Sequence, residues 1–469
     1  MSRNACVVGS GPNGLSAAIV LAQAGWHVEV LEAEPTPGGA ARSMELTLPG
    51  FLHDFGSAVH PLAAGSPFFS SLPLHEYGLE WIRSPAPLAH PLDDGTAVML
   101  EQDLGDAKAS FGVDGEAWDK LMRPFVEQWS EFIPEVLRPV RFVTKHPWLM
   151  ARFGMSALRS ARTVAGRFRS QRTRALFAGL AAHSFLSLDQ PLSAAFGMLM
   201  AVPAHAVGWP IPHGGSQSLT SALCHYLSTL GSTVRTSSRV ESLSTLSNYD
   251  LMLCDVTPRQ LVNIAGKRLS KSYKRQLASF RYGPGVFKID YALQSAIPWK
   301  APECLRAATV HLGGSFEEIA ASEKAVQRGQ HADRPFVLLA QPSLFDASRS
   351  PAGKHTVWAY CHVPNGSKID MLRKLEDQIE RFAPGFRECV LARRAFSPTE
   401  LESRDANLVG GDIGGGAMDL GQFLFRPTWR HYATSAKDIY LCSASTPPGG
   451  GVHGMCGYHA AKMALARLG

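Results

Sequence analysis

The strongest constraint on this chain is a glycine-rich turn that follows a short apolar run near the N-terminus. Residues 5–8 read Ala-Cys-Val-Val, and residues 9–14 read Gly-Ser-Gly-Pro-Asn-Gly, which matches the spacing GxGxxG. An Ala- and Leu-rich segment occupies residues 15–24 before Gly25, and a second apolar run occupies residues 27–31. Continuous apolar runs are typical of buried parallel strands, and glycine is common just after a helix. The pattern therefore predicts a strand, turn, helix and strand of the Rossmann type.

The glycines of this turn have separate physical roles in a dinucleotide-binding unit. Gly9 permits the tight turn, Gly11 lets the backbone approach a pyrophosphate, and Gly14 allows close packing of helix on strand. The N-terminus of the following helix would face the phosphates, since its N–H groups lack partners there. The expected nucleotide contacts from this turn are Gly9, Gly11, Pro12, Asn13 and Gly14. A structural turn without a ligand is the alternative reading.

An acidic residue ends the second predicted strand. Glu32 lies 18 residues after Gly14 and is followed by Ala33. A carboxylate at this place bonds the ribose hydroxyls of a dinucleotide and disfavours a 2′-phosphate. We therefore expect Glu32 and Ala33 to contact the adenosine half of the cofactor.

Two further segments carry a resemblance to a known superfamily. Residues 37–43 read Pro-Gly-Gly-Ala-Ala-Arg-Ser, and residues 440–461 join a predicted strand, a glycine-rich turn and a final helix. They resemble the fingerprints of the FAD-binding amine oxidase and phytoene desaturase superfamily. The resemblance implies that Gly38, Gly39, Ala40 and Arg42 lie near the pyrophosphate and flavin of an FAD.

The same resemblance implies that the C-terminal turn brings main-chain N–H groups to the flavin. A helix N-terminus would stabilise the negative charge of the reduced ring. The FAD contacts expected beyond the first turn are Gly56, Ser57, Val240, Ser445, Gly451, Val452, His453 and Gly454. Residues 410–413 read Gly-Gly-Asp-Ile, with no cysteine where monoamine oxidases attach their flavin, so the FAD should be non-covalent.

Internal segments make the resemblance closer. Residues 283–290, 309–314 and 410–412 also fit the branch of pyridine nucleotide-disulphide oxidoreductase domain-containing protein 2, and the likeness covers nearly the whole chain. Many members of the wider superfamily have Gly-Asp where this chain has Ala444-Ser445, which resembles the carotenoid desaturases instead. Eight cysteines form no CxxC pair, so a redox dithiol and a cysteine-rich metal site are both excluded.

Histidines supply the candidate acid/base groups. His53, Asp54 and His60 lie in a segment that matches one passing close to the flavin in the family. His60 and His453 are the candidates for proton transfer, because imidazole titrates in the required range. Structural histidines are the alternative. Lys288 could place a charge near the ring or serve as a buried ion-pair partner.

A basic segment is the second strong signal. Residues 138–174 contain ten Lys or Arg and no Asp or Glu, with Trp, Leu, Met and Phe interleaved. Basic amphipathic helices of this kind lie on anionic membranes. A solvated cap is the alternative, and nucleic acid is not expected because no reader motif accompanies the charge. Residues 190–234 lack charge but are broken by prolines, so we expect a buried wall rather than a membrane span.

These observations predict an α/β protein with a discontinuous Rossmann-type FAD domain, a mixed α+β substrate domain and a helical, basic, membrane-facing subdomain. The FAD domain would comprise residues 1–65, 206–268 and 406–469, the basic helical region 66–205, and the substrate domain 269–405. Within residues 206–268 of the FAD domain, strands are expected around residues 233–235, 240–243 and 249–256. Scattered cysteines fit a cytoplasmic or mitochondrial-matrix-like compartment, with peripheral attachment to a membrane.

The predicted function is an FAD-dependent oxidoreductase of the phytoene desaturase type. It would oxidise or isomerise an apolar lipid or isoprenoid by hydride transfer to flavin N5, with oxygen or a quinone as electron acceptor. No metal is expected, and a homo-oligomer is compatible with the sequence. The alternatives are an FAD-stabilised, membrane-associated binding or regulatory protein and a soluble amine oxidase.

Overall fold

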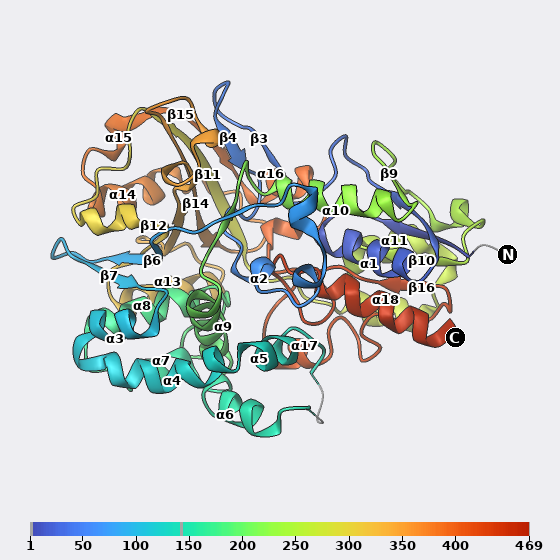
Figure 1. Cartoon of the computed structure of the whole chain (residues 1–469), viewed down its shortest axis with the longest axis horizontal. Helices are drawn as coiled ribbons and strands as arrows, with labels where there is room; N and C mark the ends of the chain where they lie inside the picture. The colour runs from blue at the N-terminus through green and yellow to red at the C-terminus, as the bar shows by residue number, and fades with distance from the viewer. Residues whose placement is uncertain (1–2, 141–143, 469) are drawn as a thin grey trace.

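A parallel five-stranded sheet forms the lobe that holds both ends of the chain (Figure 1). The computed structural model describes residues 3–140 and 144–468. The strand order is β16-β10-β1-β2-β9, and every neighbouring pair is parallel. The strands are β1 (Asn4–Val8), β2 (His27–Leu31), β9 (Thr233–Arg235), β10 (Leu251–Cys254) and β16 (Ile439–Leu441). The Rossmann-like α/β arrangement expected from the first turn is confirmed.

Helices cover both faces of this sheet, which explains why its central strands β1 and β10 are mostly apolar. One face packs against the first, a middle and the last long helix, and the other against a pair of short helices. These helices are α1 (Pro12–Gln23), α10 (Gln217–Thr229) and α18 (Met455–Leu468), then α11 (Pro258–Ala265) and α12 (Lys271–Ala278). Helix α18 crosses the start of α1 so closely that a Cβ on Gly457 would lie 1.8 Å from the Asn13 carbonyl oxygen. The two ends of the chain thus meet at the glycine-rich turn.

The second lobe is built on a seven-stranded mixed sheet of order β15-β11-β14-β13-β12-β6-β7. Its strands are β6 (Ala86–Pro91), β7 (Ala97–Leu100), β11 (Gly285–Leu293), β12 (Ala307–Leu312), β13 (Val337–Ala340), β14 (His355–Val363) and β15 (Val390–Phe396). Only the β12–β6 pair is parallel. Strands β6 and β7 form a hairpin inside the region expected to be largely helical. An Asp94-Gly95 turn, closed by the Leu92 N–H···O=C bond with Thr96, explains it.

The two faces of the seven-stranded sheet differ in chemistry. Side chains alternate between faces along a strand. Phe287, Ile289 and Tyr291 of β11 join an apolar cluster with α14 (Leu372–Phe382). Lys288 and Asp290 point to the opposite face, although the whole strand is buried. This second face looks toward the first lobe.

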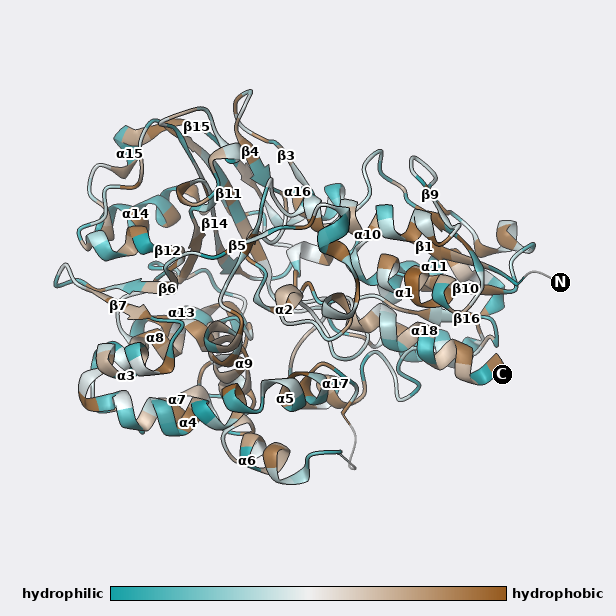
Figure 2. Ribbon diagram, viewed as in Figure 1, coloured by the Kyte–Doolittle hydropathy of each residue, from teal (hydrophilic) through white to brown (hydrophobic). Residues whose placement is uncertain are grey.

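Helices from residues 104–206 and 316–327 fill the space beside that face (Figure 1). They are α3 (Leu104–Ser110), α4 (Gly115–Glu127), α5 (Trp129–Val136), α6 (Pro147–Ala157), α7 (Ala161–Ala165), α8 (Gln171–Ala182), α9 (Ser193–Ala206) and α13 (Phe316–Gln327). Figure 2 shows apolar residues gathered in α9 and hydrophilic ones on the outer turns of α14. Helix α9 lies in the segment expected to form a buried wall, and ten of its residues are buried. Among the described residues, none of the helices has the length and apolar character that crossing a membrane requires.

The remaining elements are short and mostly connect the lobes. They are β3 (Ser43–Glu45), β4 (Leu52–Asp54), α2 (Pro61–Ala64), β5 (Trp81–Ile82), β8 (Ile211–Pro212), α15 (Phe386–Cys389), α16 (Pro398–Arg404) and α17 (Leu420–Leu424), with 3₁₀ turns between them.

The strand expected around residues 240–243 is wrong. Val240 lies in a loop, and a 3₁₀ turn begins at Leu243. The Ser242 side chain accepts a hydrogen bond from the Ser244 N–H, a local bond that competes with strand pairing.

Candidate functional site

One cavity of about 540 Å³ runs from the first glycine-rich turn to the polar face of the seven-stranded sheet. Its walls come from both lobes. The expected site residues that line it are Gly9, Gly11, Pro12, Asn13, Glu32, Ala33, Gly39, Ala40, Arg42, Gly56, Ser57, His60, Val240, Ser445, Gly451 and Val452. Gly14, Gly38, His453 and Gly454 lie behind this surface.

The first turn presents main-chain N–H groups to the cavity. Gly11 is the N-cap residue of α1 and has no side chain to cap the helix, and the Gly14 N–H of the first turn donates to Asp255 Oδ2 at 2.9 Å. A Cβ on Gly11 would lie 2.8 Å from Asp255 Oδ2, and one on Gly14 would lie 2.1 Å from the Gly9 carbonyl oxygen. Asn13 Oδ1 is buried and has no hydrogen-bond partner among the described residues. A helix N-terminus fits an anionic group of a ligand, and an unpartnered amide oxygen fits a hydrogen-bond donor such as a hydroxyl.

Glu32 is held in a fixed orientation at the end of β2. Its Oε2 accepts hydrogen bonds from the Ser10 N–H at 2.8 Å and the Ser10 hydroxyl at 2.6 Å, and its Oε1 accepts from the Glu34 N–H at 2.9 Å. The side chain is buried, yet it lines the cavity. A carboxylate with remaining lone pairs can accept further bonds from ribose hydroxyls.

The second glycine turn packs directly on the first. A Cβ on Gly39 would lie 3.2 Å from the Gly11 Cα, and Gly39 has a φ of +57°. Arg42 Nε donates to the Gly39 carbonyl oxygen at 2.6 Å, and its guanidinium lies 5.5 Å from the Phe55 ring centroid. Gly38 is turned toward Thr220 instead of the cavity. The turn therefore brings a fixed cation close to the N-terminus of α1.

The C-terminal turn divides into a cavity part and a packing part. Ser445, Gly451 and Val452 line the cavity, and the Ser445 hydroxyl is buried without a partner among the described residues. His453 Nδ1 accepts a hydrogen bond from the Met455 N–H at 3.0 Å, where α18 begins. Burial lowers the pKa of His453 to about 4. A proton-transfer role for His453 stays a prediction, and its place outside the cavity does not favour it.

His60 lines the cavity as a neutral imidazole. Its Nε2 lies 2.7 Å from the Ser216 hydroxyl, which in turn donates to the Ser57 carbonyl oxygen. The hydrogen between the two side chains therefore belongs to Nε2, and Nδ1 is left as a buried acceptor without a partner in the described structure. Burial lowers the pKa of His60 to about 4.

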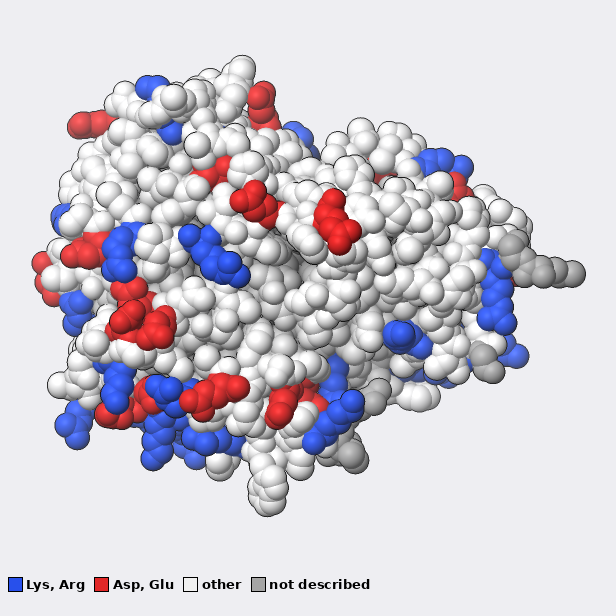
Figure 3. Space-filling model, viewed as in Figure 1, with Lys and Arg blue, Asp and Glu red and all other residues white. Residues whose placement is uncertain are grey.

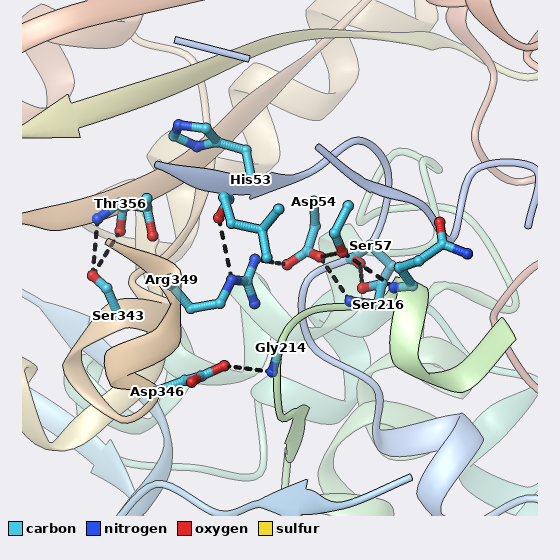
Figure 4. Close-up of polar contacts among 12 residues, drawn as sticks. His53, Asp54, Ser57, Gly214, Ser216, Ser343, Asp346, Arg349 and Thr356 are labelled. Atoms are coloured by element: carbon cyan, nitrogen blue, oxygen red, sulfur yellow. Dashed lines mark hydrogen bonds and ion pairs between the residues drawn. The ribbon is translucent and has the colours of Figure 1, made fainter. Parts of the chain in front are cut away.

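A buried ion pair between Arg349 and Asp54 clamps β4 to the segment that precedes β14 (Figure 4). Arg349 Nη2 donates to Asp54 Oδ2 at 2.6 Å, and its Nε donates to the Leu52 carbonyl oxygen at 3.1 Å. Asp54 Oδ1 accepts from the Ser43 hydroxyl at 2.6 Å and the Ser216 N–H at 2.8 Å. The guanidinium and these hydrogen bonds hold the pKa of Asp54 below its usual range, against the opposing effect of burial. The pair does not line the cavity, so its role is to position its neighbours.

His53 and Lys288 join the edge of this buried cluster. His53 Nδ1 lies 3.7 Å from Asp290 Oδ1, and burial lowers the pKa of His53 to about 3. Lys288 lines the cavity and pairs with Asp290. Burial lowers the pKa of Lys288 and raises that of Asp290 to about 6, so each shifts toward its neutral form. Lys288 is thus both an ion-pair partner and a cavity residue.

Asp255 is a site residue that the sequence reasoning missed. It follows β10, lines the cavity, and accepts a hydrogen bond from the Gly14 N–H at 2.9 Å. Burial, followed by the nearby Asp405 and Glu32 carboxylates, raises its pKa to about 7. Its position near the end of the strand expected around residues 249–256 was the available signal, because ligands bind at the carboxyl ends of parallel strands.

The other end of the cavity is largely apolar. Its walls are Phe185, Phe196, Leu199, Met200, Trp209 and Leu338. Polar groups from the sheet interrupt this surface, with Thr309 on β12 and Trp358 and Tyr360 on β14. The alternation of Trp-Ala-Tyr along β14 was visible in the sequence, but it resembles the pattern of a half-exposed strand. The cavity therefore joins a polar half suited to a nucleotide with an apolar half suited to a substrate.

The chain is similar to a known family over its first segment and to known oxidoreductases over most of its length. Residues 7–70 match the family model of the NAD(P)-binding Rossmann-like domain. The chain is 26% identical to Pyridine nucleotide-disulfide oxidoreductase domain-containing protein 2 of Mus musculus, over 99% of this chain and 94% of that protein. It is 23% identical to phytoene dehydrogenase of Streptomyces griseus, over 87% of this chain and 80% of that protein.

A solved structure of wild-type putrescine oxidase bound to putrescine has the same fold. The TM-score is 0.59 at 15% identity, and 99% of each chain is covered. These full-length similarities agree with the resemblance carried by the two terminal motifs.

Proposed function

We propose that this chain, a member of the FAD-binding amine oxidase and phytoene desaturase superfamily in the branch of pyridine nucleotide-disulphide oxidoreductase domain-containing protein 2, is an FAD-dependent oxidoreductase that oxidises an apolar substrate. The observation that carries the proposal is the single cavity, which joins the two glycine turns and the C-terminal turn to an apolar chamber.

The polar half of the cavity fits FAD. Asn13 Oδ1, Asn407 Oδ1 and Ser445 Oγ are buried, line the cavity and lack partners among the described residues. The N-terminus of α1 would bind the pyrophosphate, and Glu32 the ribose hydroxyls. Gly56 and Ser57 line the same cavity and would lie along the flavin. Bound FAD would supply a two-electron acceptor that takes hydride from a substrate C–H bond at N5.

The apolar half supports a substrate with a long hydrocarbon part. Aromatic and aliphatic side chains of α9 and of the adjoining loops exclude water there, so the substrate would be bound mainly by burial of apolar surface. His60 and Lys288 also line the cavity and would orient the substrate or hold a proton near it.

Flavin content and anaerobic reduction test this function. Protein purified without detergent should show a flavin absorbance spectrum, and the flavin should be released by denaturation. Gly11→Ala should lose the flavin, because its Cβ would meet the Asp255 carboxylate. Gly154→Ala on α6, where a Cβ meets nothing within 4 Å, is the matched control. Wild-type protein that is colourless and cannot be reconstituted with FAD would contradict the proposed function. Flavin that no apolar compound bleaches would favour a binding or regulatory protein instead.

The exposed face of α6 supports attachment to an anionic membrane. Trp148, Met155 and Leu158 are 88%, 65% and 62% exposed, and Lys145 and Arg152 are exposed nearby. Figure 3 shows Lys and Arg interspersed with Asp and Glu along the lower left edge of the molecule, next to the mostly uncharged protrusion where Figure 1 draws α6. Arg141, counted in the basic segment, lies outside the described residues. Flotation with phosphatidylserine vesicles should capture the protein, and Trp148→Ala with Arg152→Glu should weaken capture. Equal capture by neutral phosphatidylcholine vesicles would contradict an electrostatic attachment.

A soluble amine oxidase is the second candidate. The Trp358 and Tyr360 rings pack edge to face on the cavity wall, with their centroids 5.0 Å apart. Two aromatic rings placed in this way could flank an amine. Hydrogen peroxide release from putrescine or benzylamine would favour this candidate over oxidation of an uncharged substrate.

A further inference from the structure

Polar side chains of the seven-stranded sheet line the substrate half of the cavity. Thr309 on β12 and Trp358 on β14 both pair with Ala340 of the intervening strand, so they lie in one row across the sheet. Tyr360 stands two residues farther along β14. All three line the cavity, and paired residues of a ladder point to the same face.

Two of these side chains carry hydrogen-bond donors without acceptors. Thr309 Oγ1 and Trp358 Nε1 are fully buried as atoms, and neither has a partner among the described residues. Thr309 as a whole is 4% exposed. An indole N–H can only donate, and a buried donor without an acceptor is costly. A ligand that offered an acceptor oxygen would remove that cost.

A histidine pair adds a third polar group to the same chamber. His183, which follows α8 and lines the cavity, lies 3.1 Å from His311 of β12, measured between the two Nε2 atoms. His183 Nδ1 bonds no described residue. Burial lowers the pKa of His183 to about 3, and that of His311 falls well below its ordinary value. Both rings are therefore neutral at physiological pH, and the pair offers a hydrogen-bonding nitrogen rather than a charge.

The charge of this chamber is balanced. Among the described lining residues on the seven-stranded sheet, α8, α9 and the loop between these helices, Lys288 is the one charged side chain, and Asp290 pairs with it. An alkylammonium ion would have no free carboxylate to meet here, and a carboxylate ligand would have no free cation. A pure hydrocarbon would leave the Thr309 and Trp358 donors unpaired. A neutral oxygen-bearing group matches the chamber better than any of these three.

We propose that Thr309 and Trp358, with His183 beside them, bind the carbonyl oxygen of an otherwise apolar substrate. This inference rests on the proposed oxidoreductase function and narrows its substrate class to apolar ketones, aldehydes or esters. The donors fix the carbonyl at the sheet, and the apolar walls hold the chain that extends from it.

The experiment compares three probes of equal chain length on the FAD-loaded protein. Calorimetric titration with 2-decanone, decane and decylamine should give binding about tenfold tighter for the ketone, the size expected from one well-made buried hydrogen bond. Thr309→Val, which keeps the shape but removes the hydroxyl, should abolish the preference for the ketone, and Thr309→Ser should retain it. Trp358→Phe should lower ketone affinity without changing decane affinity.

Thr356→Val is the matched control. Thr356 also has a buried Oγ1 without a partner among the described residues, but it does not line the cavity. Its replacement should leave ketone binding unchanged. Equal affinities for 2-decanone and decane in flavin-containing wild-type protein would overturn this inference but not the proposed function. Tighter binding of decylamine than of 2-decanone would do the same, as would a loss of ketone preference in Thr356→Val as large as that in Thr309→Val. Protein that retains no flavin would overturn the proposed function instead.

Discussion

The two ends of the cavity are built by different means. At the nucleotide end, main-chain N–H groups of the Gly9–Gly14 turn face the ligand space, and glycines are required because a Cβ would strike neighbouring atoms. At the substrate end, side chains of alternate residues on β12 and β14 face the ligand space. A site formed by main-chain groups can be recognised from the spacing of its glycines. A site formed by side chains depends on which strands pair and on which face of the sheet is covered. This difference decides which half can be recognised in the sequence.

The largest expected effect comes from the clamp that holds the two ends in register. Arg349→Met should leave the Asp54 carboxylate buried and unpaired, and should lower the free energy of unfolding by about 3–5 kcal/mol. Urea unfolding followed by tryptophan fluorescence measures the loss. Arg281→Met, which breaks an ion pair with Asp419 whose side chains are 63% and 38% exposed, should cost less than about 1 kcal/mol. Similar losses of unfolding free energy in the two variants would show that the buried Arg349–Asp54 pair contributes no more to stability than an exposed ion pair.

A second test acts on the backbone end alone. Gly457→Ala places a Cβ 1.8 Å from the Asn13 carbonyl oxygen, so α18 or the glycine turn must move. We expect a loss of about 1–3 kcal/mol and a lower flavin content after purification. Thermal unfolding and the ratio of flavin to protein absorbance measure the two effects. Full flavin content in this variant would show that the meeting of the chain ends does not shape the cofactor half.

The pH dependence of the backbone end follows from Asp255. Its pKa is about 7 in the folded protein against an ordinary value of 3.8, so the folded state retains a proton that the unfolded chain releases. The stability contribution of this group therefore falls as the pH rises from about 4 to 7. FAD affinity should fall over the upper part of that range, because the ionised carboxylate lies beside the site proposed for the pyrophosphate.

Asp255→Asn should flatten both dependences, whereas Asp370→Asn, at an exposed residue, should leave them as in the wild type. Equilibrium unfolding and fluorescence titration with FAD between pH 5 and 8 provide the measurements. An unchanged slope in Asp255→Asn would place the titrating group elsewhere.

The smallest expected effect lies at the side-chain end. Tyr360→Phe removes one hydroxyl from the cavity wall and should change the free energy of unfolding by less than about 1 kcal/mol. The flavin spectrum should keep its intensity, because the tyrosine belongs to the substrate half. Loss of flavin from Tyr360→Phe would show that the two ends of the cavity do not act independently.

The sequence supported a detailed prediction of the nucleotide half. The strand, turn and helix of residues 5–24 and the final helix are present because glycine spacing and apolar runs act locally. The β6–β7 hairpin was overlooked, although the Asp94-Gly95 turn signal was present. The strand expected around Val240 failed because serine side chains bond the nearby backbone there.

Tertiary pairing explains what the sequence could not reveal about the site. Asp255, His183 and Thr309 become cavity residues only when β10, α8 and β12 take their places beside distant segments. Residues with polar side chains at every second position of β14 resemble an exposed strand face. Their burial depends on α9 and on the opposite lobe, which no local pattern encodes.

The Asp54–Arg349 contact has a consequence for how molecules enter. Separating Asp54 from Arg349 would break a fully buried, hydrogen-bonded ion pair, so an opening motion through this contact would be costly. Ligands should therefore enter the cavity without separating these two residues. Binding rates should then depend on the cross-section of the incoming molecule rather than on a slow conformational step.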